Sequence, residues 1–568
     1  MSVIHWRIST IKHQIVIVLP LLIACGGAVV LSAANQYRGL QQNESAGVEV
    51  TVDRIYPPMP PLTPQQRAEM VERQESEMEN SGGFIVPPGP PGRPLVDDPE
   101  TKIISEADRA NTIVDPAPGD IKFGRITADS SVPTAAAMQV VEPSTSNMGP
   151  YIFYLNNSEA DFSADGGTTF AKIDTEALRK PPSDSPNYCC DSSIVYDPSH
   201  SMWVISRMYE DTALTHGVVQ LSIFKNPPDV ACTYYIDPDA NPNDNNVKPD
   251  YPQLGLSDNY LYLTTSEFIS GAWNRDEIRR FSLEDVDSCV SNLTAHFFRR
   301  TNGGVKRVWT PVRGAHEIMY WAQIETTTQL RVFTWPESVA SPTSALVKVQ
   351  STNFVDSDCR GGNNNKDWIG AYGWHANEGF LRGAVARGGV GSATPETSRL
   401  QFFWNGGADG TASHPQAFVR SAVLQLPNLA VLDEPNINSL EVCYGYADVY
   451  PNARGDLGVT IAYGGKKNGG GAGLSAGVGI EDEYTSGYNL QNVYTTTTGT
   501  DMPNSLRYGD YLSVKSWQPC PLWWSAANYA YSGGGNQKNI IARYVEFGRA
   551  RDQDCYTRWK DAVPPKLP

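Results

Sequence analysis

Alternating apolar and polar positions dominate the chain after about residue 118 and predict β-strands joined by tight turns. The clearest hairpin lies within 189–206, where two alternating runs flank a turn at 197–200. Because no amphipathic helical run of convincing length interrupts this pattern, we predict an all-β region. The further predicted strands share the period of two and lie at 151–155, 218–224, 308–310, 318–324, 330–335, 400–404 and 540–547.

One sequence pattern recurs through this region: an Asp, a short predicted strand, a turn and a second predicted strand. Its copies begin at Asp191, Asp250, Asp367, Asp448 and Asp510, about 60 to 120 residues apart. Each unit is too small to bury its own faces, so neighbouring units must stack against one another. The repeat therefore indicates radial or linear repetition of one β unit.

We interpret each copy as the two inner strands of a propeller blade. At four strands per blade, residues 118–550 would form a six- or seven-bladed β-propeller, and we expect seven blades. Closure of the ring would remove exposed sheet edges, which an open β array must protect. Two stacked β-sandwich domains are the alternative, but the copies span the region without a linker.

The N-terminal segment 1–34 contains an uncharged apolar run of 20 residues, Ile15–Ala34, which is long enough to cross a bilayer as a helix. Arg7 and Lys12 precede it, as the positive-inside rule expects of a signal anchor. A cleaved signal peptide ending at Ala34 and a lipoprotein modified at Cys25 are the alternatives. All three interpretations place most of the chain outside the cytoplasm, attached to a membrane in two of them.

Residues 35–117 are rich in proline and predict a mostly disordered stalk that separates the membrane segment from the propeller. Within it, 64–81 has the capping signals of a short polar helix, with too few apolar residues to bury a face. Residues 551–568 are predicted to be a C-terminal tail, which Cys555 ties to the last blade.

Composition narrows the possible partners and the compartment. The formal net charge of -17 and the lack of a basic run argue against a nucleic-acid partner. Of nine cysteines, the eight beyond Cys25 suit an oxidising compartment with up to four disulfides. The neighbours Cys189 and Cys190 could form a vicinal disulfide, but we expect them to form separate bridges.

No cofactor is required by any motif in the chain, and no cysteine or histidine spacing indicates zinc. The segment Asp237–Asn241 has the oxygen spacing of a calcium loop. Pro242 and Lys248 stand where an EF-hand needs Gly and Glu, so a looser structural Ca²⁺ site is the alternative to an ordinary loop.

The segment Ser163–Phe170 resembles the Asp box of sialidase-like propellers, Ser-x-Asp-x-Gly-x-Thr followed by an aromatic residue. Phe170 stands where the family usually has Trp. The resemblance implies a secreted bacterial propeller of the sialidase-like type, many of which have no established activity. In that family the box lies away from the active site, so it marks the fold.

Sialidases bind the substrate carboxylate with three arginines. They use a Tyr paired with a Glu as the nucleophile and an Asp as the catalytic acid. Their early Phe-Arg-Ile-Pro motif is matched only loosely by Phe123–Thr127, which lacks the proline. The resemblance therefore does not carry the catalytic residues over to this chain.

Candidate site residues lie at or near the predicted blade openings, because the starts of innermost strands converge on one mouth of a propeller. The alternative for each Asp is a turn cap that binds backbone N–H groups. Candidates for proton transfer or nucleophilic attack are Asp191, Asp250, His316, Asp367, Tyr508 and Asp510. Candidates for binding a substrate carboxylate or sugar ring are Arg313, Arg360, Trp368 and Arg507.

These residue types favour an acidic glycan or polysaccharide as the ligand. The expected function is that of a glycoside hydrolase or polysaccharide lyase, and the alternative is a non-catalytic carbohydrate-binding or adhesion module. If Asp191, Asp250, Asp367 and Asp510 open their blades, they surround one channel. Their repulsion would then need compensation, which the three arginines are expected to supply.

Overall fold

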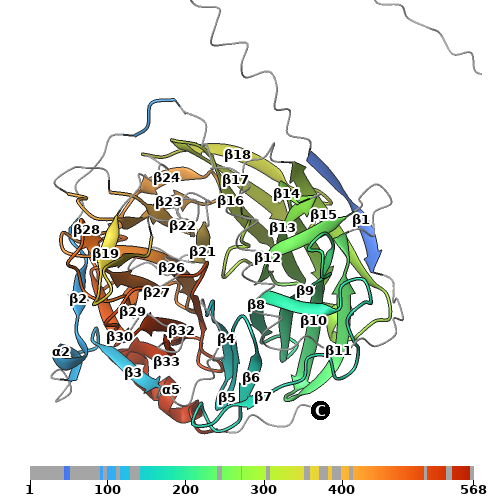
Figure 1. Ribbon diagram of the computed structural model, residues 1–568, viewed down its shortest axis with the longest axis horizontal. Helices are drawn as coiled ribbons and strands as arrows, with labels where there is room; N and C mark the ends of the chain where they lie inside the picture. The colour runs from blue at the N-terminus through green and yellow to red at the C-terminus, as the bar shows by residue number, and fades with distance from the viewer. Residues whose placement is uncertain are drawn as a thin grey trace, which may run out of the picture. The chain divides into compact units, whose positions relative to one another are not determined.

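The computed structural model consists of antiparallel β-sheets arranged around a common centre (Figure 1). It describes residues 44–51, 90–93, 99–110, 116–127, 141–238, 246–269, 271–301, 308–350, 358–369, 381–386, 398–408, 413–503, 508–532 and 540–562. In these ranges the strands form eight sheets. The radial arrangement is that of a β-propeller and confirms the all-β expectation.

The first three sheets along the chain follow one another as antiparallel meanders. Their shared order, from the centre outwards, is the order of the sequence (Figure 1). The first contains β4 (Ser144–Met148), β5 (Tyr151–Leu155), β6 (Ala160–Ser163) and β7 (Ala171–Lys172). The second contains β8 (Asn187–Asp197), β9 (Met202–Glu210), β10 (Gly217–Asn226) and β11 (Asp229–Ile236). The third contains β12 (Val247–Leu256), β13 (Tyr260–Ile269), β14 (Ala272–Ser282) and β15 (Leu293–Thr301).

The later sheets continue around the centre in the same sense. The fourth contains β16 (Ile318–Thr326), β17 (Gln329–Pro336) and β18 (Thr343–Lys348). The fifth contains β21 (Arg382–Ala386), β22 (Arg399–Gly406), β23 (Phe418–Gln425), β24 (Ala430–Asp433) and β25 (Asn436–Ile437). The sixth contains β26 (Cys443–Pro451), β27 (Leu457–Gly464), β29 (Ser475–Glu481) and β30 (Asn492–Thr497). The seventh contains β31 (Ser513–Ser516), β32 (Trp524–Tyr531) and β33 (Ile540–Arg549).

A small additional sheet and four short helices complete the described structure. The sheet contains β19 (Cys359–Gly361), β20 (Lys366–Asp367) and β28 (Lys466–Lys467). The helices are α2 (Glu106–Ala110), α3 (Leu283–Asp287), η4 (Ala550–Asp552) and α5 (Gln553–Trp559). None of the helices that the structure describes is long and apolar enough to span a bilayer, and segment 15–34 lies outside the described residues.

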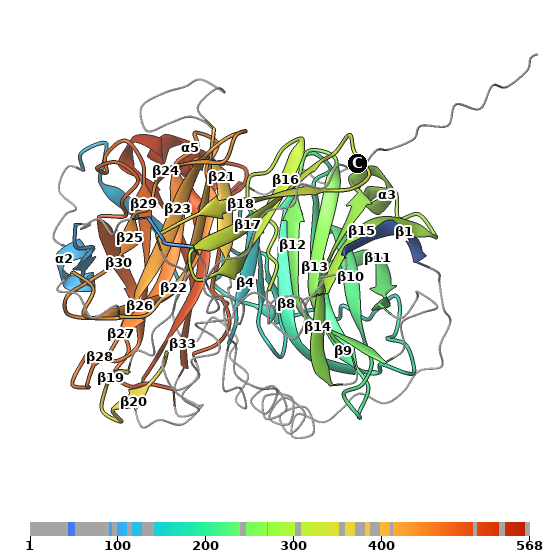
Figure 2. The same cartoon turned by 90° about the horizontal axis from the view of Figure 1, so that it is seen from above.

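Three N-terminal strands lie along the outer edges of sheets formed much later in the chain (Figures 1 and 2). β1 (Glu44–Thr51) pairs with β15, β2 (Lys102–Ile104) pairs with β30, and β3 (Ile121–Ile126) pairs with β33. The first two fall within 35–117, the range predicted to be a stalk. Two described segments of that range therefore belong to the sheets, whereas the predicted helix at 64–81 lies outside the described residues.

The buried core lies between neighbouring sheets, where strand alternation directs apolar side chains. Phe153 on β5 contacts Trp203 on β9 and Phe224 on β10, with ring centroids 5.4 and 5.2 Å apart. The predicted hairpins form β8–β9, β12–β13, β26–β27 and β31–β32. The alternation of residues therefore did identify the inner strands of these four sheets.

The turn between β6 and β7 is held by side chains of Ser163 and Asp165. Ser163 Oγ accepts a hydrogen bond from Gly167 N at 2.7 Å, and Asp165 Oδ1 accepts one from Thr169 N at 2.9 Å. Gly166 and Gly167 have φ of +69° and +81°, a region that favours glycine. These contacts fix a turn on the outer strands of the first sheet.

Four disulfides join all eight described cysteines, as an oxidising compartment predicts. Cys520–Cys555 ties α5 to the last sheet, as expected. The pairing of Cys189 with Cys190 is a vicinal disulfide, so the expectation of separate bridges for these two residues was wrong. The remaining pairs are Cys232–Cys289, between β11 and the segment after α3, and Cys359–Cys443, between β19 and β26.

Candidate functional site

The innermost strands run in the same direction and bond to one another through side chains. Segment 308–313 contacts β21 through a parallel β-bridge between Arg313 and Ala384. Elsewhere a Ser or Asp side chain accepts the backbone N–H of the next strand, taking the place of a carbonyl oxygen. The four such contacts are Ser144 Oγ from Ile194 N at 3.2 Å, Ser193 Oγ from Leu254 N at 3.2 Å, Asp448 Oδ2 from Val514 N at 2.9 Å, and Ser513 Oγ from Thr145 N at 3.4 Å.

These contacts define two ends of the ring. We call the end at which the innermost strands begin the upper end, and the end at which they finish the lower end. At the upper end, β8, β12 and β26 each have a break in register that places one residue at positive φ: Asp191 at 44°, Tyr251 at 51° and Tyr446 at 58°. Such bulges change the direction of side chains within the strand.

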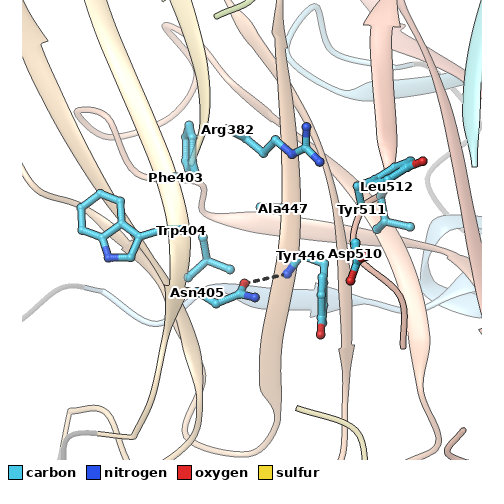
Figure 3. Close-up of a pocket in the computed structure, with 10 residues that line it drawn as sticks. Arg382, Phe403, Trp404, Asn405, Tyr446, Ala447, Asp510, Tyr511 and Leu512 are labelled. Carbon is cyan, nitrogen blue, oxygen red and sulfur yellow. Dashed lines mark hydrogen bonds between the residues drawn. The ribbon is translucent and has the colours of Figure 1, made fainter. Parts of the chain in front are cut away.

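Figure 3 shows the side chains that line a small void at the upper end, among them Tyr511, Asp510 and Arg382. The void measures 10 Å³, about the volume that one water molecule needs. Burial, followed by the nearby carboxylates of Asp191, Glu142 and Asp510, raises the pKa of Tyr511 well above its usual value. The guanidinium of Arg382 lies 5.5 Å from the Tyr511 ring centroid. Tyr511 is thus a neutral hydrogen-bonding group here.

The carboxylates at the upper end are held by neighbouring donors. Glu142 accepts hydrogen bonds from Asp510 N, at 2.8 Å, and from the amide of Asn157. Asn157 Oδ1 in turn accepts a hydrogen bond from Asp191 N at 3.2 Å. Asp250 Oδ1 accepts the N–H of Tyr251 at 3.1 Å. Asp250 therefore matches the alternative in which an Asp side chain orders its strand, whereas Asp191 and Asp510 enter these contacts through their backbone N–H groups.

Between the two ends, Arg313 and Arg382 lie near one carboxylate, Asp448. Arg313 Nη2 lies 3.7 Å from Asp448 Oδ1, and Arg313 Nη1 donates to Pro311 O at 2.6 Å. Arg382 Nη1 donates to Gln253 Oε1 at 2.8 Å. Burial and the positive charge of Arg313 lower the pKa of Arg382 to about 10, against the opposing effect of Asp448. All five of these residues are buried, which places two guanidinium groups away from bulk water.

The lower end encloses a cavity of 450 Å³, within the size range of sites for small ligands. Lys515, on β31, lies at its inner end and is buried. Burial lowers the pKa of Lys515 to about 7, and Arg313 and Arg382 act in the same direction against Asp448. The amine lies 5.8 Å from the ring centroid of Tyr450.

The wall of this cavity carries two carboxylate–histidine pairs. Asp258 Oδ1 lies 2.8 Å from His316 Nδ1, and Asp197 Oδ2 lies 2.6 Å from His200 Nδ1. Asp258, His316 and Asp197 line the cavity themselves. The other polar side chains of the wall are hydroxyl and amide groups, those of Ser146, Tyr196, Ser199, Ser257, Tyr450, Asn452, Ser516 and Gln518.

The predicted site residues do not form one cluster. Asp191 and Asp250 lie within β8 and β12 at their breaks in register, and Asp510 precedes β31. Arg313 lies between the ends, and His316 lies at the lower end. The proposed single ring of carboxylates and arginines is therefore divided between two ends of the ring.

Of the other candidates, Trp368 and Tyr508 pack against Tyr446 at the upper end, with ring centroids 5.9 and 5.2 Å from it. Asp367 and Trp368 belong to the small sheet and its turn, where Trp368 Nε1 donates to Gly464 O at 2.9 Å. Tyr508 is buried and stacks on Tyr529 with centroids 4.3 Å apart. Arg360 is exposed and pairs with Asp358 on the same turn. Arg507 lies outside the described residues.

The functional candidates that sequence analysis missed are Glu142, Arg382, Asp448 and Lys515. Asp448 had been identified as the start of a repeat copy, so its equivalence to the other copies was an available signal. Lys515 and Arg382 carry no motif. Their burial follows from the arrangement of the sheets that contain β31 and β21, and the local sequence does not indicate it.

One group of carboxylates has the spacing of metal ligands. Oxygens of Asp456, Asp482 and Glu483 lie within 4.8 Å of one another. The guanidinium of Arg551 lies among them, 2.8 Å from Asp456 and 3.8 Å from Asp482, and it also pairs with Glu483. Arginine already provides the positive charge here. Most of the predicted calcium loop lies outside the described residues.

Comparisons with known proteins gave solved structures only. No protein-family model matches the chain, and no curated protein matches it. Among solved structures, it resembles the NanB sialidase from Streptococcus pneumoniae with a TM-score of 0.35, at 8% identity over 64% of this chain and 70% of that one.

Two fungal enzymes give similar values. The α-L-arabinofuranosidase Arb93A from Fusarium graminearum has a TM-score of 0.36, at 10% identity over 75% of this chain and 98% of that one. The α-L-arabinanase from Penicillium chrysogenum has a TM-score of 0.35, at 8% identity over 75% and 98%. Scores this low assign neither a family nor an activity to the chain, and its architecture rests on its own sheets.

Proposed function

We propose that the protein is an extracytoplasmic, seven-bladed propeller that binds an acidic glycan or polysaccharide at the lower end of the ring. The seven blades would be all sheets except the small one formed by β19, β20 and β28. The observation that carries the proposal is that Lys515, which lines the 450 Å³ cavity, is buried and has no carboxylate ion pair within the described residues, while Arg313 and Arg382 add positive charge from outside the cavity wall.

Buried charges of one sign are unfavourable unless an opposite charge compensates them. Three cationic side chains share Asp448, whose nearest cationic contact is Arg313 at 3.7 Å. A ligand carboxylate at the inner end of the cavity would supply the missing negative charge. Because the whole chain carries a net charge of -17, this positive potential is local and would select an anionic group that enters the cavity.

The cavity wall suits a sugar in its other properties. Tyr196 and Tyr450 offer aromatic rings, and serine hydroxyls with Asn452 offer donors and acceptors for sugar hydroxyl groups. The four disulfides support an oxidising, extracytoplasmic location. Membrane attachment through residues 15–34 is part of the proposal and rests on the apolar run alone.

A titration of the full chain with uronate- or sialate-containing oligosaccharides and their neutral counterparts tests the proposal. Calorimetry should show binding of the acidic ligands only. Replacing Arg313→Met should weaken this binding by about tenfold or more, which corresponds to about 1.4 kcal/mol. Arg360→Met is the matched control, because Arg360 is exposed on the small sheet. Equal affinity for neutral and acidic ligands would exclude the proposal.

Catalytic processing is the second candidate function, as a glycoside hydrolase or polysaccharide lyase. It is favoured by the His316–Asp258 pair on the cavity wall, since a histidine oriented by a carboxylate suits proton transfer. Incubation with the bound acidic glycan should then release shorter products, and His316→Asn should abolish release while binding persists. Binding without any product would leave the protein a binding module.

A further inference from the structure

Two buried lysines near the ring centre have opposite surroundings. Lys248, on β12, lies 3.6 Å from Glu210 Oε2 and therefore has a carboxylate partner. Lys515 is equally buried, and each side chain is about 5% exposed. Within the described part of the chain, Lys515 forms no ion pair with a carboxylate. It instead lies beside the guanidinium groups of Arg313 and Arg382.

The position of Lys515 gives a ligand access to its amine. The residue lines the inner end of the 450 Å³ cavity, whereas Lys248 is absent from the wall of that cavity. An amine that lies beside fixed positive charge and away from bulk water is favoured in its neutral form. A neutral lysine amine is a nucleophile toward carbonyl carbon.

We propose that Lys515 forms a reversible imine with the carbonyl group of an oxo acid bound in the lower cavity. The class includes small oxo acids and the open-chain forms of acidic sugars, which carry both a carbonyl group and a carboxylate. Arg313 and Arg382 do not line the cavity, and they would attract the carboxylate of the ligand toward Lys515 through their positive charge.

The reaction balances without any oxidant or reductant. The nitrogen lone pair of Lys515 attacks the carbonyl carbon while the C=O π electrons move to oxygen. A proton moves from nitrogen to that oxygen and gives a carbinolamine. Loss of the hydroxyl group as water then leaves the C=N bond, so one water is released for each imine formed. Addition of water reverses the sequence.

The charged groups around Lys515 set the pH at which the amine reacts. Arg313 approaches from segment 308–313, Arg382 from β21, and Asp448 with Tyr450 from β26. Burial and the two arginines lower the pKa of Lys515 to about 7. At neutral pH a substantial fraction of the amine is therefore uncharged, whereas an exposed lysine is almost fully protonated. The other titratable groups of the cavity wall are Tyr196, Asp197, Asp258 and His316.

Reductive trapping tests the proposal on the full chain. The protein is incubated at pH 7 with glyoxylate and sodium cyanoborohydride, which reduces imines and leaves disulfides intact, and adducts are then located by peptide mass spectrometry. Lys515 should carry the carboxymethyl adduct well before Lys248 or the exposed lysines. Labelling spread evenly over exposed lysines, or no adduct on Lys515, would overturn the proposal.

Further experiments vary the carbonyl compound to distinguish the possible ligands and substitute Arg313 and Lys515 to test their roles. Glucuronate replaces glyoxylate to test an open-chain acidic sugar, and propanal replaces it to test a carbonyl compound without a carboxylate. Arg313→Met should slow trapping of glyoxylate more than that of propanal. Lys515→Arg should remove the adduct. If this variant does not fold, locating the adduct by mass spectrometry in the unsubstituted protein tests the assignment to Lys515. Trapping without any glycan affinity would support the imine and exclude the proposed glycan ligand.

Discussion

At the upper end of the ring, Glu142 accepts hydrogen bonds from Asp510 N and Asn157, and the void beside Tyr511 and Asp510 measures 10 Å³. At the lower end, Lys515 is buried near two arginines and borders a cavity of 450 Å³. Both ends bury charged groups. The difference is that Glu142 is bound by neighbouring protein groups, whereas Lys515 borders space for an external group.

This comparison shows why burial of charge alone does not identify a site. The carboxylates of Glu142 and Asp250 accept backbone N–H groups at the upper end, which is a structural role. At the lower end Lys515 lines solvent-sized space. We therefore assign function to the lower end, although the sequence had favoured the upper one.

The largest expected effect concerns Asp448, the carboxylate between the two ends. Asp448→Ala should lower the free energy of unfolding by about 3–5 kcal/mol, because it leaves buried Arg313 without its partner and removes the acceptor of Val514 N. Urea denaturation measures the loss. Asp258→Ala is the control, since the Asp258 side chain is 46% exposed, and it should change stability by less than about 1 kcal/mol.

The second prediction concerns pH, because the two ends should respond in opposite directions. Burial raises the pKa of Glu210, at the upper end, from 4.5 to about 7, so it contributes stability that is lost as pH rises through this range. The pKa of Lys515 is lowered from 10.5 to about 7, so stability is lost as pH falls through that range. Each slope should reach at most about 1.4 kcal/mol per pH unit.

Denaturation at stepwise pH checks these slopes with one variant for each end. Glu210→Gln should reduce the fall between pH 4.5 and 7, to which the raised pKa values of Asp161 and Glu481 also contribute, and should leave the rise at higher pH. Lys515→Met should remove the rise between pH 7 and 10.5 and leave the fall at lower pH. If both variants altered the same range, the assignment of the two slopes to two ends would be wrong.

A smaller effect is expected from added volume. Ala447→Leu, at the closely packed upper end, should destabilise the fold by about 1–3 kcal/mol because no space accommodates the larger side chain. Ser516→Leu, on the wall of the lower cavity, should change stability by no more than about 0.5 kcal/mol. Thermal unfolding of the pair gives the difference, and equal losses would contradict an open lower end.

The smallest effect is expected for Arg360→Ala. Sequence analysis predicted that Arg360 and Arg507 bind the ligand, but the Arg360 side chain is 49% exposed and pairs only with Asp358. Its removal should change stability by about 0–1 kcal/mol and leave ligand binding unaltered. Calorimetry with the acidic glycan provides the measurement, and lost binding would restore Arg360 to the site.

The strands within each sheet were predictable because their partners are near in sequence. The turn at 197–200 joins β8 and β9, so a local pattern contains both partners. β2 and β3 lack this advantage, since Lys102 pairs with Asn492 and Ile121 pairs with Arg549. Proline-rich flanks suggested a stalk, and no local feature reveals an edge that is formed almost 400 residues later.

The candidate site was less predictable for a related physical reason. Residues that open repeated strands could be found from the repeat, and three such carboxylates do lie at one end. The environment of Lys515 depends on Arg313 and Arg382, which come from two other sheets. A lysine in an alternating strand usually faces water, so the sequence gives no reason to expect a buried amine there.

The strands β1, β2 and β3 lie outside β15, β30 and β33, and this arrangement has a mechanical consequence. Force applied to the N-terminus acts on these outermost strands before it reaches the inner hairpins. They should detach in chain order, β1 first and β3 last, and each step would lengthen the tether while the lower cavity keeps its shape. If the protein is held at its N-terminus, an applied force would detach the three outer strands and leave the inner strands paired. The outer strands could pair again when the force is removed.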